Sequence, residues 1–190
     1  IINLNFALKY PNQVNALACW NSGIETGLLP KASRIILAIE GLFRNQNLPS
    51  LIAWKLSFEA WNSKFKPNRT KSDWLSRDEN EVNLYVNDPY CGFEVSISMW
   101  RDVLDGVFYA GNNKNIQKLP KELPVHIVGG AEDPCTLNGG DMEKLATKLQ
   151  NSGLSDVTCT ILEGTRHESL NEINRDQTTK QFIKWLEERF

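Results

Sequence analysis

Two short apolar runs in the C-terminal third of the chain constrain its fold more than any other feature. Each run ends in glycine and precedes a segment of helical spacing: PVHIVGG (124–130) precedes DMEKLATKLQN (141–151), and DVTCTILEG (156–164) precedes the last amphipathic segment. The order strand, helix, strand, helix predicts parallel strands joined by crossover helices, and therefore an α/β fold. In the last helix we expect four apolar side chains to face inward: Phe182, Ile183, Trp185 and Leu186.

The remainder of the chain divides into a further part of the same sheet and a helical insertion. Residues 1–10 have helical spacing, and VNALACWNSG (14–23) is typical of a buried strand that enters a loop. The middle of the chain has the spacing of about four amphipathic helices and no convincing strand. We therefore predict a core formed by residues 1–23 and 120–190, with a helical cap formed by residues 24–119.

The apolar side chains of the cap helices have two interpretations. Most are expected to pack inside the cap, while a few line a cavity for an acyl chain. The side chains in question include Leu28, Leu29, Ile35, Ile36, Ile39, Leu42, Phe43, Met99, Trp100, Val103 and Leu104.

Composition excludes several classes of function. A formal net charge of −2 gives the chain no general attraction to nucleic acid, which we exclude as a partner. No stretch approaches the roughly 20 apolar residues that cross a bilayer. The cysteines are widely spaced and form no CxxC pair, so we expect reduced thiols, no metal site and a cytoplasmic protein. No metal or organic cofactor is implied.

Ionisable residues follow both glycine-ended strands at matching positions. Asp133 stands three positions after Gly130, and His167 stands three positions after Gly164. The carboxyl ends of parallel strands meet at one edge of a sheet, so an acid and an imidazole placed there can meet. A carboxylate that binds one ring nitrogen fixes the tautomer of a histidine general base. The sequence thus predicts Asp133 and His167 as catalytic residues.

Several segments together resemble the α/β-hydrolases of the monoacylglycerol lipase, lysophospholipase and serine aminopeptidase type. The segments are FALKYPNQVNALACWNSG, DWLSRD with the following DPYCGF, GGAEDP around the acid, and GTRHESLNE around the histidine. The resemblance covers nearly the whole chain and implies a Ser-His-Asp acyl-enzyme mechanism. It also implies a small-molecule ester as substrate, either a lipid such as a monoacylglycerol or a lysophospholipid.

One part of the family's pattern is absent. No serine of the chain lies in the G-x-S-x-G turn that carries the nucleophile in this family. The helix at residues 1–10 resembles the helix that follows this turn, so we expect the serine a few residues before Ile1, in a missing N-terminal portion. The chain alone is then expected to be inactive, because covalent catalysis needs the nucleophile.

Substrate contacts are expected in the cap. The resemblance places Cys91 and Phe93 near the substrate channel, although DPYCGF is equally typical of a turn, and we add Trp100 from the apolar helices. Peripheral contact with a membrane is kept open as a further partner. Two alternatives also stay open: a non-catalytic hydrolase-like protein that binds an apolar ligand or partner, and an epoxide-type hydrolase with an aspartate nucleophile.

Other polar residues have structural interpretations. Within DWLSRD, we expect Asp73, Arg77 and Asp78 to order the cap through ion pairs and capping rather than to touch substrate. His126 is expected to be a hydrogen-bonded strand residue. Glu168 is not assigned to catalysis, and nothing in the sequence activates Cys135 as a nucleophile.

Overall fold

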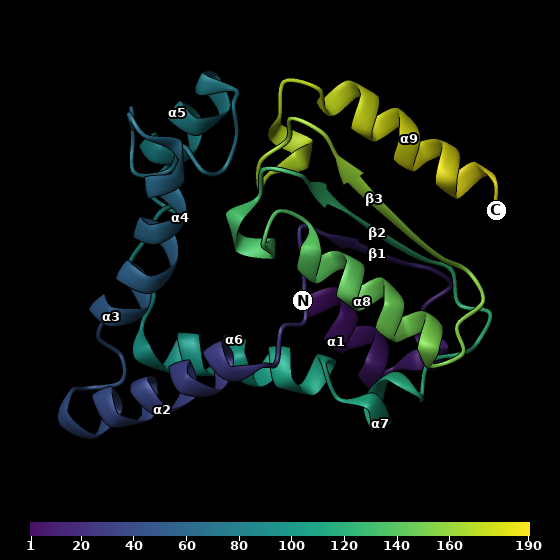
Figure 1. Cartoon of the computed structure of the whole chain (residues 1–190), viewed down its shortest axis with the longest axis horizontal. Helices are drawn as coiled ribbons and strands as arrows, with labels where there is room; N and C mark the ends of the chain where they lie inside the picture. Colours follow the sequence, from purple (N-terminus) through teal and green to yellow (C-terminus); the bar gives the residue numbers. More distant parts are fainter.

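A computed structural model describes residues 1–190 and has an α/β architecture. Its sheet has three strands in the order β1 (Leu17–Trp20), β2 (Val125–Gly130) and β3 (Val157–Leu162), and both pairs are parallel. The predicted α/β fold with a parallel sheet is therefore confirmed. All three strands run toward the same edge, so the loops that leave their carboxyl ends are neighbours (Figure 1).

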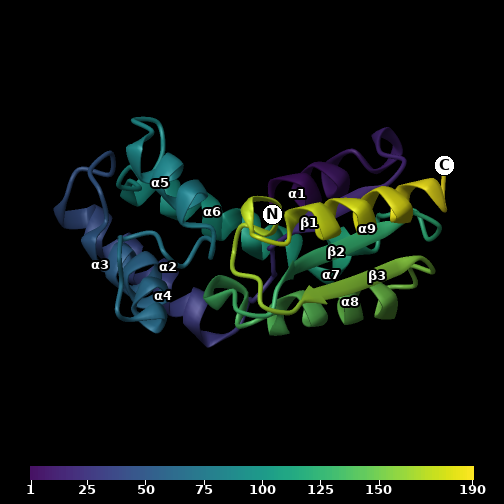
Figure 2. The ribbon, with the colours of Figure 1, turned by 90° about the horizontal axis from the view of Figure 1, so that it is seen from above.

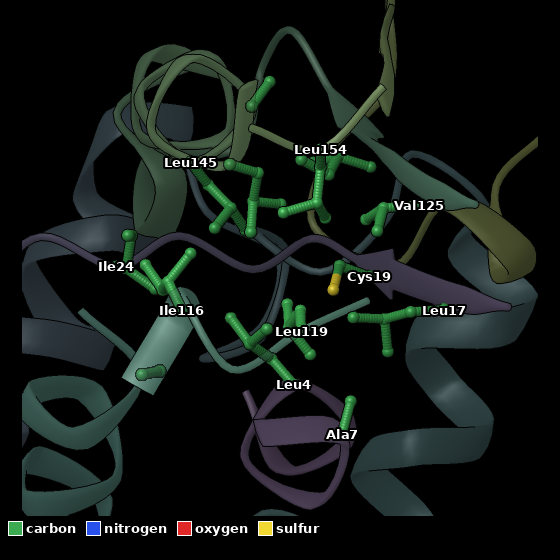
Figure 3. Close-up of a cluster of buried hydrophobic side chains, with 14 of the residues drawn as sticks. Leu4, Ala7, Leu17, Cys19, Ile24, Ile116, Leu119, Val125, Leu145 and Leu154 are labelled. Atoms are coloured by element: carbon green, nitrogen blue, oxygen red, sulfur yellow. The ribbon is translucent and has the colours of Figure 1, made fainter. Parts of the chain in front are cut away.

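Helices cover both faces of the sheet (Figures 1 and 2). These are α1 (Ile2–Lys9), α8 (Gly140–Asn151) and α9 (Arg175–Glu187). The alternation of side chains along β2 explains their placement. Val125 and Ile127 belong to the buried cluster formed with α1 and α8, whereas His126 stacks on Trp185 of α9. Figure 3 shows the first of these two layers, where Leu4 and Leu145 converge on the strands.

The cap is helical and lies beyond the carboxyl edge of the sheet (Figure 1). Its helices are α2 (Leu28–Phe43), α3 (Leu51–Trp54), α4 (Ala60–Asn62), α5 (Glu79–Asn87) and α6 (Ile97–Ala110), and α7 (Asn113–Ile116) follows α6 back toward the core. A π-helical turn, Lys55–Glu59, joins α3 to α4. Short 3-10 turns occur at Pro11–Gln13, Ser63–Phe65, Pro134–Thr136 and Ser169–Asn171. Ile116 and Leu119, at the end of the region predicted as cap, pack in the core beneath the sheet (Figure 3).

Two packing predictions are wrong. Most apolar side chains of α2 are exposed rather than internal, with Leu42 at 79% and Phe43 at 83%, because α2 packs on α6 along one side only. Ile183 of α9 is 47% exposed, since the helix turns its Phe182 and Trp185 side toward His126 and leaves Ile183 to one side. No helix has the combination of length and apolar sequence that a membrane-spanning helix needs.

Candidate active site

Asp133 lies at the start of the loop after β2, and its side chain has no exposed surface. It caps the 3-10 turn Pro134–Thr136: the backbone N–H of Cys135 donates to Oδ1 at 2.9 Å, and the Thr136 hydroxyl donates to Oδ2 at 3.0 Å. A buried carboxylate is costly unless hydrogen bonds compensate it. These contacts hold the carboxylate in one orientation at the carboxyl edge of the sheet.

His167 lies in the loop after β3, and its Nδ1 is 2.9 Å from Oδ2 of Asp133. The Nδ1–H group donates a hydrogen bond to the carboxylate, which leaves Nε2 as the basic nitrogen of the neutral ring. The His167 side chain is 24% exposed, and its ring makes no other hydrogen bond within the chain. The two predicted residues are therefore in contact, with the basic nitrogen free for a proton from elsewhere.

The absence of a side chain at Gly130 permits this contact. A Cβ at Gly130 would overlap the carbonyl oxygens of Thr165 and Arg166, which directly precede His167. The backbone N–H of Glu132 also donates to the Thr165 carbonyl at 2.9 Å. The glycine at the end of β2 thus lets the histidine loop approach the loop of Asp133.

Trp74 of the cap lies against His167, a contact that the sequence reasoning missed. The two ring centroids are 4.8 Å apart and the rings are inclined at 39°. Trp74 also joins an aromatic cluster around Phe58, whose other members are Trp54, Trp61 and Trp100. The sequence indicates Trp74 only through its position within DWLSRD, whose charged residues have a structural interpretation.

Cys135 is the one thiol near the pair. A donor atom from each of Asp133, Cys135 and His167 lies within 4.8 Å of the others, and this is the only such group of potential metal ligands in the chain. Burial, followed by the charges of Asp133 and Asp141, raises the pKa of the Cys135 thiol. A protonated thiol is a poor nucleophile and a poor metal ligand, so the chemistry of the site rests on the carboxylate and the imidazole.

A hollow of about 450 Å³ lies between the cap and the carboxyl edge of the sheet. Its wall is mainly apolar and includes Leu29, Leu37, Trp61, Trp100, Leu104 and Leu137. Ile1, which precedes α1, and Cys135 also line it. Of the three predicted substrate contacts, the structure brings only Trp100 to this hollow. Cys91 and Phe93 line a second hollow within the cap, together with Trp74 and Phe58.

The remaining polar residues have structural contacts. Asp78 caps α5 by accepting from the N–H of Asn80, and Asp73 accepts from the N–H groups of Arg69 and Thr70. The Nδ1 of His126 is 2.8 Å from the Thr158 hydroxyl on the neighbouring strand. These contacts agree with the structural interpretations of the cap motif and of His126.

Known structures share this fold across different enzymes. A thermostable carboxyl esterase from Bacillus coagulans, in complex with glycerol, is 19% identical with a TM-score of 0.82, and the match covers 99% of this chain and 61% of that one. A monoacylglycerol lipase from Paleococcus ferrophilus is 17% identical with a TM-score of 0.71, covering 98% and 64%. A soluble variant of the Saccharomyces cerevisiae monoglyceride lipase, with a substrate analogue, is 19% identical with a TM-score of 0.69, covering 100% and 61%.

The chain thus spans less than two thirds of the length of these structures. No curated protein matches the sequence significantly. The family described as serine aminopeptidase, S33, matches residues 1–174, which include both Asp133 and His167. With this match over most of its length and with the fold described above, the chain belongs to the serine aminopeptidase S33 family of α/β-hydrolases.

Proposed function

We propose that this chain supplies the acid and the base of a serine hydrolase that cleaves carboxylic esters. The observation that carries the proposal is the 2.9 Å hydrogen bond between His167 Nδ1 and the buried carboxylate of Asp133. This arrangement leaves Nε2 available as the base and stabilises the imidazolium that forms when the base takes a proton. Membership of a hydrolase family supports the same assignment.

The nucleophile in this proposal is a serine upstream of Ile1. Ile1 and Cys135 both line the main hollow, which supports a nucleophile close to Ile1 in the chain. The serine hydroxyl would attack the ester carbonyl while His167 takes its proton. His167 would then return the proton to the leaving alcohol as the ester bond breaks. Water would attack the acyl-enzyme while His167 takes a proton from it, and His167 would give this proton to the serine oxygen as the acyl–serine bond breaks.

The apolar lining of the main hollow favours an acyl chain as the bound group. We assign Trp100 to this acyl side. The second hollow contains Trp74, which touches His167, so we place Cys91 and Phe93 on the side of the leaving alcohol. The proposed substrates are monoacylglycerols or lysophospholipids, and such lipid substrates bring the enzyme to a membrane surface.

Hydrolysis of an acyl-chain series of monoacylglycerols and p-nitrophenyl esters by the full-length gene product tests this function. We expect turnover by the wild type and a loss of about 1,000-fold or more in kcat for His167→Ala. His126→Phe is the matched control, because His126 packs on the opposite end of the sheet against α9 and should leave kcat unchanged. Equal turnover by the wild type and His167→Ala would refute the proposal.

A second candidate is a non-catalytic protein that binds an apolar ligand in the main hollow. The apolar wall favours it, as does the fact that the His167 ring has no hydrogen bond to a serine of this chain. The same experiment separates the two functions, since a full-length protein that binds a fluorescent fatty acid but hydrolyses no ester supports the second.

A further inference from the structure

The cap segment Asp73–Asp78 is bonded directly to the loop that carries His167, although the two are far apart in the sequence. The N–H of Glu168 donates to the Leu75 carbonyl at 2.7 Å, and the Ser76 hydroxyl donates to the Asn171 carbonyl at 2.8 Å. Neither bond involves a side chain of the Asp133–His167 pair. They fasten the backbone that follows His167 to the cap.

Glu172 is the centre of this junction. Its side chain has no exposed surface, and its carboxylate accepts four hydrogen bonds. The N–H of Arg166 (2.9 Å) and the N–H of Arg77 (3.1 Å) donate to Oε1, whereas Arg77 Nε (3.0 Å) and the N–H of Ile173 (3.1 Å) donate to Oε2. One carboxylate therefore joins the residue before His167 to both the backbone and the guanidinium of a cap residue.

Arg166 also connects the histidine loop to the cap. Its guanidinium donates to the carbonyls of Asp73 at 2.6 Å and Ser76 at 3.1 Å, and it lies 4.0 Å from the centre of the Phe65 ring. The backbone carbonyls on either side of Trp74 and Leu75 are thus held by the residue next to His167. This arrangement places the Trp74 ring on the imidazole.

We propose that Glu172 and Arg77 are positioning residues that hold His167 in register with Asp133 by fixing the histidine loop to the cap. The inference rests on the proposed role of His167 as the general base. A buried carboxylate saturated by donors from two segments leaves neither segment free to shift alone. The cap segment and the histidine loop therefore move together, and the cap controls the orientation of the base as well as access to the site.

The exchange rate of the His167 Nδ1 proton with water, measured by NMR on the full-length gene product, reports this orientation. A proton shared with a buried carboxylate gives a low-field resonance that is protected from exchange. We expect Glu172→Gln and Arg77→Met to speed this exchange by about 10-fold or more and to lower kcat by about 10- to 100-fold, with KM nearly unchanged.

The Arg77→Met variant still tests the inference if Glu172→Gln does not fold. Arg77→Met keeps Glu172 bonded to three backbone N–H groups and removes the guanidinium of a side chain that is 31% exposed, together with its bonds to Glu172 and Asn174. Asp156→Asn is the matched control, because it breaks the ion pair between Asp156, which precedes β3, and Arg189, which follows α9, at the opposite edge of the sheet. The control should leave both the exchange rate and kcat within about twofold of the wild type.

Folded Glu172→Gln and Arg77→Met variants with wild-type proton exchange would overturn the inference, as would an Asp156→Asn variant with the same acceleration. The exchange readout does not depend on turnover. Full-length protein that hydrolyses no ester would refute the proposed function, and the exchange rates would still decide whether Glu172 positions His167.

Discussion

Asp133 combines full burial with three accepted hydrogen bonds, one of which comes from His167. Asparagine is nearly isosteric with aspartate and can still accept from the Cys135 N–H, so Asp133→Asn should fold. Its amide cannot stabilise an imidazolium and favours the wrong tautomer. We expect kcat for ester hydrolysis by the full-length protein to fall by about 1,000-fold or more. A variant with wild-type kcat would show that the contact is only structural.

Gly130 provides a second test at the residue scale. In Gly130→Ala the new Cβ meets backbone carbonyls that cannot rotate away, so we expect the free energy of unfolding to fall by about 1–3 kcal/mol. Gly140→Ala is the matched control, because nothing lies within 4 Å of a Cβ built there. The control should be neutral or more stable by about 0.4–1 kcal/mol in urea unfolding. Equal losses in both variants would contradict the close approach of the two loops.

The sequence predicted the Asp133–His167 contact but little of what surrounds it. The sequence shows directly that each of these residues follows the end of a strand. Because the strands are parallel neighbours, residues at these positions lie close together in the fold. Trp74 and Glu172 depend instead on how the cap docks on the histidine loop, across more than 90 residues of chain. No local pattern records such docking, so the sequence predicts that Arg77 helps to order the cap but not that it bonds Glu172.

At the scale of elements, α9 is held to the sheet by an aromatic stack. The ring of His126, a residue of β2, stacks on Phe182 and Trp185 of α9. Burial, followed by the charge of Arg189, lowers the pKa of His126 from its usual 6.5. In the unfolded chain the imidazole takes up a proton as the pH falls through 6.5, before the folded protein does. This residue therefore stabilises the fold above pH 6.5, and that contribution is lost as the pH falls toward the lowered pKa.

Urea unfolding at pH 7.5 and pH 5.5 tests this linkage. We expect the wild type to lose more stability between these two pH values than His126→Phe does, because phenylalanine keeps the stacking and has no proton to bind. In the variant the Thr158 hydroxyl still donates a hydrogen bond to the Val125 carbonyl, at 3.3 Å. If wild type and variant lose the same stability on acidification, His126 does not titrate as described.

Helix α2 illustrates the limit of amphipathic patterning. The pattern indicates that a helix has an apolar face but not what covers that face, and most of the apolar face of α2 is covered by nothing within this chain. Leu37 is 2% exposed, whereas Leu42 is 79% exposed. We expect Leu37→Ala to cost about 2–5 kcal/mol of unfolding free energy, and Leu42→Ala to change it by less than about 0.5 kcal/mol. Urea unfolding that gives similar losses for both would mean that α2 is packed differently.

At the scale of the whole molecule, the main hollow is assembled from parts distant in the sequence. Its lining comes from the residue before α1, the loop after β1, the cap helices and the loop after β2. The sheet was predictable because glycine-ended apolar runs and helical spacing are short-range features that all indicated the same topology. The shape of the hollow was not, since it depends on the angle at which the cap leaves the sheet, which side-chain packing decides.

The rate of serine modification by a fluorophosphonate tests the central claim, that Asp133 and His167 together activate a nucleophile, most directly. We expect modification of the full-length protein at a serine upstream of Ile1, with a rate constant about 1,000-fold or more lower in His167→Ala. Modification at the same rate in wild type and His167→Ala, or modification of no serine at all, would contradict it.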